Sequence, residues 1–447
     1  MNTPFLTDAS SGIASAAIAP RTDRANAGAR SHSRSRVAEA AYIAFLVLIF
    51  VGVSPFAVPG GTVGVDPAAS GAGDFVRQIC YLTVFGVLVS TAVTQRGWRA
   101  FSAIPLLLAV LLLWCALSTS WSLDPAVTFR RAVLVSVVAV SAFLAVEMIG
   151  AKRSLQLLGY VLAGIVILNW VSLFLIPQAK HFANDAEPGV AGDWRGLYVH
   201  KNITGALCAN SAIIFLYSAI KTRRLSNLLL CLAALGFLIG TASKSSIALL
   251  PLAVMAGCLY RFAARNRLDR QIIWLASALL VFVATVAICA SWDAITPMLQ
   301  DPRLFTGRVA IWQAEIAFIL GHPMLGSGFG TFAYTGDNSP IYQYINSPWV
   351  GTVANGHQGY LELLVTLGIP GFCLAMLCLF VGPAMQFAAI NRIDLDLRAL
   401  LFTLFTFFLM HNFMETTFLR ADGVEWVTFL LVLAMLRTSV ARKTAII

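Results

Sequence analysis

Three basic side chains lie close together in the stretch GDWRGLYVHKNITG, residues 192–205: Arg195, His200 and Lys201. A helix is predicted to begin directly after them, near Asn202. The first turn of a helix presents unpaired N–H groups and the positive end of the helix dipole. Because such a place suits phosphate, the stretch predicts an anion-binding site. An ion pair with a nearby carboxylate is the alternative explanation.

A second arginine lies in the segment TGRVAIWQAEIAFILGHP, which predicts an amphipathic helix from about Thr306 to Gly321. Residues at spacings of three and four share one face of this helix: Arg308, Trp312, Glu315 and Ile319. The planar guanidinium of Arg308 suits phosphate oxygens, because it donates two parallel hydrogen bonds. The alternative is a surface ion pair between Arg308 and Glu315.

The stretch NGHQGYLELLVTLGIPG, residues 355–371, contains His357 where a long loop is predicted to re-enter an apolar helix. A neutral imidazole can accept a proton near neutral pH, so His357 is a candidate general base. A structural histidine at the interface is the alternative. Glu362 is a candidate for substrate binding, although its spacing of five residues does not require it to face His357. The GIPG end predicts a bent helix.

Three weaker signals complete the set. Lys244, in TASKSS, either lines an outer cavity together with these residues or extends toward the interface between membrane and water. The glycines of GSGFG, residues 326–330, resemble a phosphate loop, but no strand precedes them and nucleotide binding is not expected. In MHNFMETTF, His411 and Glu415 stand four residues apart, so they could pair for a structural or a catalytic purpose.

The composition determines the kind of element that carries these residues. Of the 447 residues, 58% are hydrophobic and 12% are charged, with a mean hydropathy of +0.79. Continuous apolar runs, without strand-like alternation, predict an all-α polytopic membrane protein. The eight cysteines show no disulfide or metal-ligand spacing, so we expect no metal and no cofactor. The net charge of +10 reflects membrane orientation rather than nucleic-acid binding, because the basic residues cluster between the runs.

About twelve membrane spans are predicted from the apolar runs. They cover residues 38–58, 76–94, 102–119, 129–149, 154–176, 202–220, 225–241, 245–263, 271–290, 359–384, 397–413 and 424–438.

Basic clusters in alternate loops predict that both termini are cytoplasmic. Residues 1–36 are expected to form a disordered cytoplasmic tail, and residues 37–447 to form the transmembrane domain. The opposite face then carries two sizeable loops, at 177–201 and 291–358. The second is large and partly helical, and long loops of this kind usually carry function.

Four motifs in order resemble the O-antigen ligase and polymerase superfamily: WRGLYVHKN, TGRVAIW, GHPMLGSGFGTF and GHQGYLELLVTLGIPG. The family pattern of the last motif is met by His357, Gln358, Gly368 and Gly371. The resemblance covers residues 38–438. It implies a GT-C-like fold in the bacterial inner membrane and a metal-independent, inverting glycosyltransferase whose active site faces the periplasm. The expected donor is a glycan on undecaprenyl diphosphate.

The resemblance also assigns roles to residues. Arg195 and Arg308 would hold the diphosphate, and His357 would activate the acceptor hydroxyl. Further contacts to the diphosphate or the glycan are expected from the neighbouring polar and aromatic side chains: His200, Lys201, Lys244, Trp312 and Glu362.

Within the superfamily the sequence is most similar to ExoQ-type exopolysaccharide polymerases, which join lipid-linked repeat units. An O-antigen ligase that transfers the glycan to lipid A–core is the alternative, and Gln358, where the family often has Asn or Ser, leaves the acceptor open. Membrane lipids and other proteins of polysaccharide export are further expected partners. A lipid-linked sugar transporter or flippase, or a scaffold without chemistry, would be a different class. No broken-helix pair in matching halves supports the transporter.

Overall fold

The computed structural model describes residues 21–56, 75–182, 189–264, 308–333, 339–345, 356–389 and 394–441, and the isolated positions 271, 286, 290 and 291. The described part is helical and contains no strand, only an isolated bridge between Lys180 and Trp194. This confirms the all-α prediction.

The helices follow one another as α1 Arg21–Phe50, α2 Phe75–Arg96, α3 Leu106–Leu117, α4 Pro125–Ile149, α5 Ala151–Leu175, α6 Lys201–Thr222, α7 Leu225–Gly240, α8 Lys244–Ala263, α11 Arg308–Gly321, α12 Gly359–Met376, α13 Gly382–Ala388, α14 Leu395–His411 and α15 Val424–Ala441. Short 3₁₀ turns lie at Gly97–Ala103, Ser118–Ser120, Pro177–Ala179 and Pro340–Gln343, and a π-helical turn at Leu377–Val381 joins α12 to α13.

Six helical segments in the described residues are long and apolar enough to cross a membrane: Phe75–Ala103, Pro125–Ile149, Ala151–Leu175, Lys201–Thr222, Lys244–Ala263 and Gly359–Ala388. Every predicted span overlaps a helix except 271–290, most of which lies outside the described residues. The twelve-span topology remains a prediction. Helix α1 begins at Arg21, inside the segment expected to be a tail, and residues 1–20 lie outside the described part.

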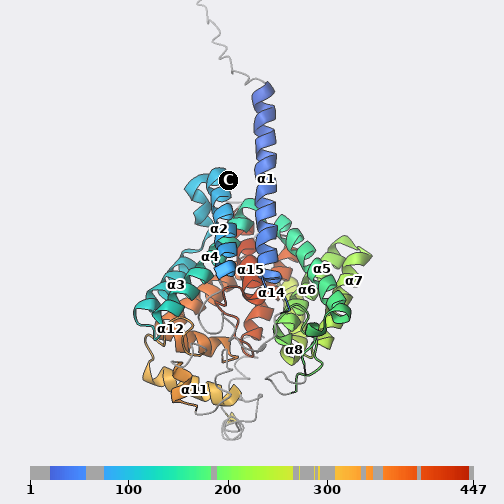
Figure 1. Cartoon of the computed structure of the whole chain (residues 1–447). Helices are drawn as coiled ribbons and strands as arrows, with labels where there is room; N and C mark the ends of the chain where they lie inside the picture. Colours follow the sequence, from blue (N-terminus) through green and yellow to red (C-terminus); the bar gives the residue numbers. More distant parts are fainter. Residues whose placement is uncertain are drawn as a thin grey trace, which may run out of the picture.

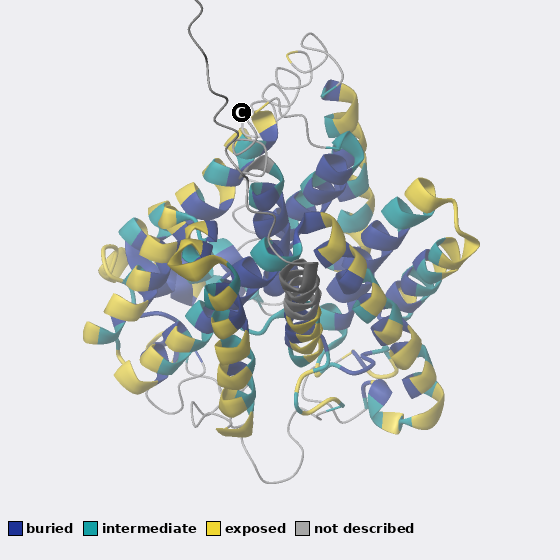
Figure 2. Cartoon of the chain, turned by 90° about the horizontal axis from the view of Figure 1, so that it is seen from above, coloured by how far each residue is buried: buried dark blue, intermediate teal, exposed yellow. Residues whose placement is uncertain are grey.

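Helices α14 and α15 lie among the other helices, as Figure 1 shows. The side chains of α15 from Leu430 to Val432 are fully buried. Many large apolar side chains instead lie on the outside of the bundle, including Phe129, Tyr160 and Phe174, and Figure 2 shows exposed residues around a buried centre. An apolar surface of this extent suits contact with lipid rather than with water.

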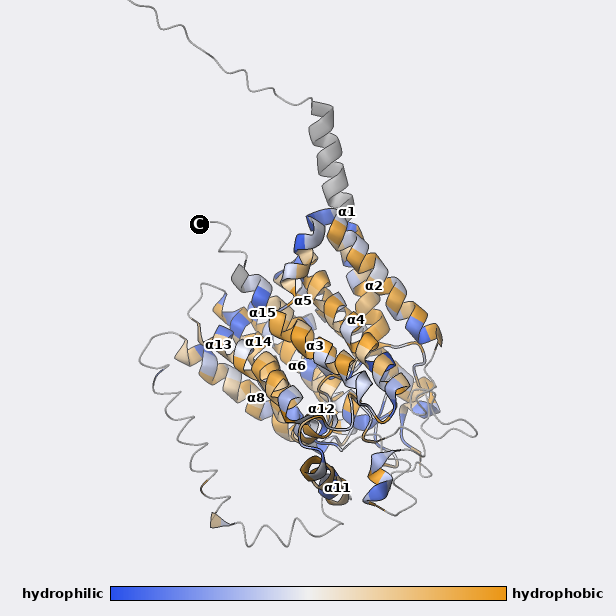
Figure 3. Ribbon diagram, turned by 90° about the vertical axis from the view of Figure 1, so that its left-hand side faces the viewer, coloured by the Kyte–Doolittle hydropathy of each residue, from blue (hydrophilic) through white to orange (hydrophobic). Residues whose placement is uncertain are grey.

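Two ion pairs that connect neighbouring helices mark one end of the bundle. Arg153 at the start of α5 contacts Glu39 of α1 at 2.7 Å, and Lys221 at the end of α6 contacts Asp394 before α14 at 3.1 Å. Since α6 has 22 residues, its other end lies about 30 Å away. Helix α11 lies at that other end, away from the start of α1 (Figure 3). Arg153 and Lys221, two basic residues expected to be cytoplasmic, therefore lie opposite the predicted site residues of α6 and α11.

The bend expected at GIPG is present in α12. Gly368 has a φ of 67° and interrupts the helical backbone, which frees carbonyl groups from their usual partners. The loop after α11 supplies replacements, because the N–H of Ser327 donates to the carbonyl of Val365 at 2.9 Å and the N–H of Gly328 donates to that of Thr366 at 3.1 Å. The glycines of GSGFG therefore have a structural role in capping the bend.

Candidate active site

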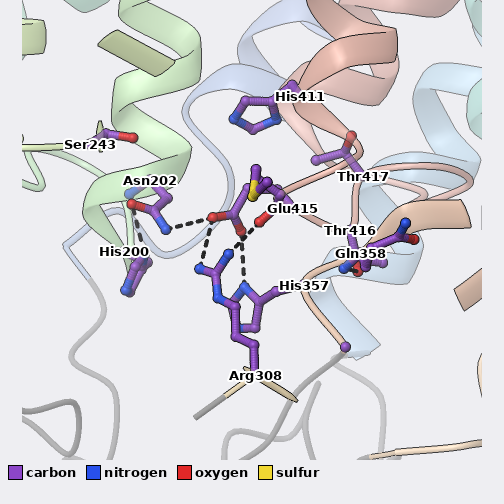
Figure 4. Close-up of polar contacts among 12 residues, drawn as sticks. His200, Asn202, Ser243, Arg308, His357, Gln358, His411, Glu415, Thr416 and Thr417 are labelled. Atoms are coloured by element: carbon purple, nitrogen blue, oxygen red, sulfur yellow. Dashed lines mark hydrogen bonds and ion pairs between the residues drawn. The ribbon is translucent and has the colours of Figure 1, made fainter. Parts of the chain in front are cut away.

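Three polar side chains from separate parts of the chain converge on the carboxylate of Glu415 (Figure 4). Arg308, the first residue of α11, approaches Oε1 with its Nη2 at 3.1 Å. The Nδ1 of His357, before α12, lies 3.0 Å from Oε2. Asn202, in the first turn of α6, donates to Oε1 at 2.7 Å. The structure therefore brings together two of the three predicted catalytic residues.

The turn that carries His357 is held against the segment after α14. The N–H of Gln358 donates to the hydroxyl of Thr416 at 3.0 Å, and the N–H of Gly359 donates to the carbonyl of Asn412 at 2.8 Å. His357 itself has a φ of 52°, a left-handed conformation that side chains other than glycine rarely adopt and that is often found at functional sites. Two hydrogen bonds to the segment after α14 thus fix the backbone around the imidazole.

The charge state of Glu415 decides how the imidazole is protonated. Burial alone would raise the pKa of Glu415, but the hydrogen bond and charge of His357, followed by the charges of Arg308 and His411, lower it to about 2. At neutral pH the group is therefore an ionised carboxylate that can only accept hydrogen bonds. It follows that Nδ1 of His357 carries the hydrogen of this contact, so that the lone pair lies on Nε2 whenever the ring is in its neutral form.

Arg308 uses two of its nitrogen atoms within this cluster. Besides the contact with Glu415, its Nη1 donates to the carbonyl of Met414. Its side chain is 17% exposed, so it remains within reach of a ligand. The alternative surface pair between Arg308 and Glu315 is wrong, since Glu315 is fully buried and Arg308 pairs with a carboxylate far along the chain.

Arg195 occupies a different environment from the other two catalytic candidates. Its side chain is fully buried, its Nε donates to the carbonyl of Gln178 at 2.7 Å, and its Nη1 donates to that of Val199 at 3.1 Å. The carbonyl of Arg195 in turn accepts the hydroxyl of Thr204 in α6. These contacts shape the turn that leads into α6 and so place Asn202 beside the carboxylate.

The other basic candidates lie around the same end of the bundle. The imidazole of His200 caps α6 by accepting from the N–H of Asn202 at 3.2 Å. Lys201 forms an ion pair with Asp193 at 2.6 Å. An ion pair of this kind was the alternative to an anion-binding site in the stretch 192–205. Lys244 is exposed at the first residue of α8.

Two further candidates contact the residue that precedes His357. The indole N–H of Trp312 donates to the carbonyl of Gly356 at 2.8 Å. An oxygen of Glu362 accepts from the N–H of Gly356 at 3.4 Å. Both side chains therefore support the backbone of the histidine turn.

Sequence reasoning did not assign Asn202 or Glu415 to the site. Glu415 drew attention only as a partner of His411, four residues away, whereas its side chain contacts residues 107 and 213 positions distant. The imidazole of His411 instead lies 3.4 Å from the hydroxyl of Ser246. In the described residues, no group of three or more His, Cys, Asp or Glu side chains could hold a metal ion.

Residues 229–376, about a third of the chain, match the model of the O-antigen ligase family. The matched segment includes Arg308 and His357, while Asn202 and Glu415 lie outside it. No curated protein matches the chain.

Proposed function

Because the chain belongs to the O-antigen ligase and polymerase superfamily, we propose that it is a polysaccharide polymerase. It joins oligosaccharide repeat units carried on undecaprenyl diphosphate, at the periplasmic face of the bacterial inner membrane, during exopolysaccharide synthesis. Residues 37–447 form the catalytic membrane domain in this proposal, and both termini are cytoplasmic. The observation that carries it is the bridge that Glu415 makes between Arg308 and His357.

In the proposed step, Nε2 of His357 takes the proton of the acceptor hydroxyl. The acceptor oxygen forms a bond to the anomeric carbon of the donor, on the face opposite the diphosphate. The bond from that carbon to the diphosphate oxygen breaks, and its electron pair leaves with undecaprenyl diphosphate. Attack from the opposite face inverts the anomeric centre, and no metal is needed if cationic side chains stabilise the leaving group.

Glu415 acts through its partners in this scheme and is a positioning residue. Its carboxylate fixes the tautomer of His357 and stabilises the imidazolium that forms when the proton is taken, as in other acid–base pairs. The same carboxylate orients the guanidinium of Arg308, whose remaining donors face the departing diphosphate in the proposal. Asn202 completes the arrangement by binding the oxygen that Arg308 also contacts.

Arg195 has a more distant part in the proposal. Its described hydrogen bonds fix the turn before α6, and because the side chain is fully buried, it reaches the diphosphate only if that turn moves. Lys201 and Lys244 lie at the starts of α6 and α8, where they add positive charge for the glycan diphosphate, and His200 caps α6 beside them.

A second candidate function is that of an O-antigen ligase, which transfers the glycan to lipid A–core. It is favoured by the matched family itself, which is described as an O-antigen ligase family. The two functions share donor, leaving group and base, and differ only in the molecule that brings the acceptor hydroxyl.

The decisive experiment incubates the purified protein in lipid nanodiscs with lipid-linked repeat units, with and without lipid A–core. Polymerase activity gives longer lipid-linked chains without lipid A–core, and ligase activity gives product only when it is present. His357→Ala and Arg308→Ala are expected to abolish product. Arg153→Ala, which removes an ion pair at the opposite end of the bundle, is the matched control. Wild-type product from either of the first two variants would refute the site.

A further inference from the structure

Glu315 is the most unusual acidic residue in the described part of the chain. It lies on α11 and is fully buried, and neither of its carboxyl oxygens has a hydrogen-bond partner among the residues that the structure describes. An isolated carboxylate in such a place would be very unfavourable. The side chain is not needed for an ion pair with Arg308, which contacts Glu415 instead. The burial of this group therefore needs another explanation.

The carboxyl of Glu315 lies against the backbone that carries the catalytic histidine. A Cβ atom added to Gly356 would lie only 2.0 Å from its Oε1, so the glycine is what lets the carboxyl approach. From the other side, an oxygen of Glu362 accepts from the N–H of Gly356 at 3.4 Å. Two carboxyl groups, one from α11 and one from α12, thus enclose the residue that precedes His357.

Two buried carboxyl groups that approach the same glycine cannot both be ionised at low cost. Burial raises the pKa of Glu315 well above its ordinary value, and the charge of Glu362 raises it further. At neutral pH the pair therefore holds one proton. The neutral carboxyl of Glu315 then stands beside the carboxylate of Glu362, and the two groups together carry a single negative charge.

Other charged groups approach the pair from each neighbouring element. Arg131 of α4 and Arg420 of the segment before α15 interact electrostatically with Glu362. Arg308 stands at the start of α11, and His357 follows Gly356 in the chain. Positive charge from two directions stabilises the carboxylate of Glu362, and the carboxyl of Glu315 stays neutral.

We propose that Glu315 is a positioning residue for His357, and that its uncharged carboxyl, packed against Gly356 opposite the carboxylate of Glu362, holds Gly356 in place and sets the alkaline limit of glycan transfer. The inference rests on the proposed function where glycan transfer is measured, whereas the effect on the histidine turn can be measured without it. Loss of the proton from Glu315 leaves two carboxylates on either side of one glycine. Their repulsion displaces the turn, and Nδ1 of His357 leaves Glu415.

The first test compares pH profiles of glycan transfer for the wild type and Glu315→Gln. A glutamine keeps the size of the side chain. The N–H donors of its amide do not lose their hydrogens as the pH rises over this range. The wild type is expected to lose about tenfold in rate per pH unit above the titration of the pair, whereas Glu315→Gln stays active over that range. Glu39→Gln, at the opposite end of the bundle, should retain the wild-type profile.

The second test does not depend on activity. Hydrogen–deuterium exchange is measured for residues 356–366 in the wild type and Glu315→Gln, at the same alkaline pH. The N–H groups of Gly356 and Gln358 donate to Glu362 and Thr416, so they report the position of the turn. Faster exchange in the wild type than in Glu315→Gln is expected, together with equal exchange at neutral pH.

Either of two results would overturn the inference: an alkaline loss of rate that Glu315→Gln shares with the wild type, or equal exchange in both proteins at alkaline pH. A folded Glu315→Gln protein that is inactive at every pH would also overturn it, since the glutamine should keep the turn in place. If the wild type transfers no glycan at all, the proposed function fails, while the exchange experiment still tests the pair.

Discussion

Replacing Glu415 with glutamine tests the central contact of the site with the smallest change in shape. The amide oxygen of the new side chain can still accept from Arg308 and Asn202. Its amide nitrogen then faces Nδ1 of His357, where two donors would meet. The imidazole relieves this by moving its proton to Nε2, and in that tautomer it has no lone pair for the acceptor hydroxyl.

The size of the effect follows from the electrostatics of the carboxylate. Its pKa lies at about 2 instead of the ordinary 4.5, which corresponds to roughly 3 kcal/mol of preference for the ionised form among these partners. If the same interaction stabilises the imidazolium in the transition state, its removal slows transfer by roughly a hundredfold. Wrong protonation of His357 adds to this loss.

The assay is the initial rate of chain extension in nanodiscs, with lipid-linked repeat units at saturating and subsaturating concentrations. The loss should appear mainly in kcat, because the positioning of a base acts on the chemical step. Glu147→Gln is the matched control, since it removes a glutamate–arginine pair with Arg96 at the opposite end. Size-exclusion profiles and thermal unfolding establish that the variants are folded.

A rate for Glu415→Gln within about threefold of the wild type, in a protein of normal stability, would refute the tautomer argument. A large rise in KM with unchanged kcat would instead assign Glu415 to donor binding through Arg308.

Three further outcomes are expected. Arg308→Lys should slow transfer by about tenfold to a hundredfold, because an ammonium group cannot reproduce the fork that contacts Glu415 and Met414; a rate equal to that of the wild type would contradict this. Because the pKa of Glu415 is lowered, its carboxylate stabilises the fold above pH 4.5, and this stabilisation is lost as the pH falls toward 2. The unfolding free energy of the wild type should therefore decrease with falling pH over this range, and the decrease should be smaller in Glu415→Gln. Gly368→Ala should destabilise the protein by about 3 kcal/mol in thermal unfolding, since its Cβ would lie 2.2 Å from the carbonyl oxygen of Met324, whereas Gly164→Ala, which meets open space, should not.

Local signals in the sequence predicted the helices well. Spacings within a few turns predicted the helix face that carries Arg308 and the end of the helix at Gly321. The structure has α11 at Arg308–Gly321, as these spacings indicate. The bend at Gly368 followed from glycine and proline in one short motif. Its capping by the loop around Ser327 did not, because that contact joins segments from different parts of the chain.

The site was predicted only in part for the same reason. Arg308 and His357 stood out because their residue types suit anion binding and proton transfer. Glu415 could not be joined to them, since Arg308 and His357 lie 107 and 58 positions away from it in the chain. The position of Arg195 near a helix start suggested exposure to a ligand, whereas the carbonyl groups of neighbouring turns occupy its guanidinium.

The location of Glu415 in the chain has a consequence for how this protein can be divided. An expressed fragment that ends with the recognisable family segment at residue 376 would retain the arginine and the histidine but lack the acid that links them. In the proposed function, the last two helices are therefore part of the minimal catalytic unit. Splitting the gene before α14 and co-expressing the two halves should restore transfer only when the second half contributes its glutamate.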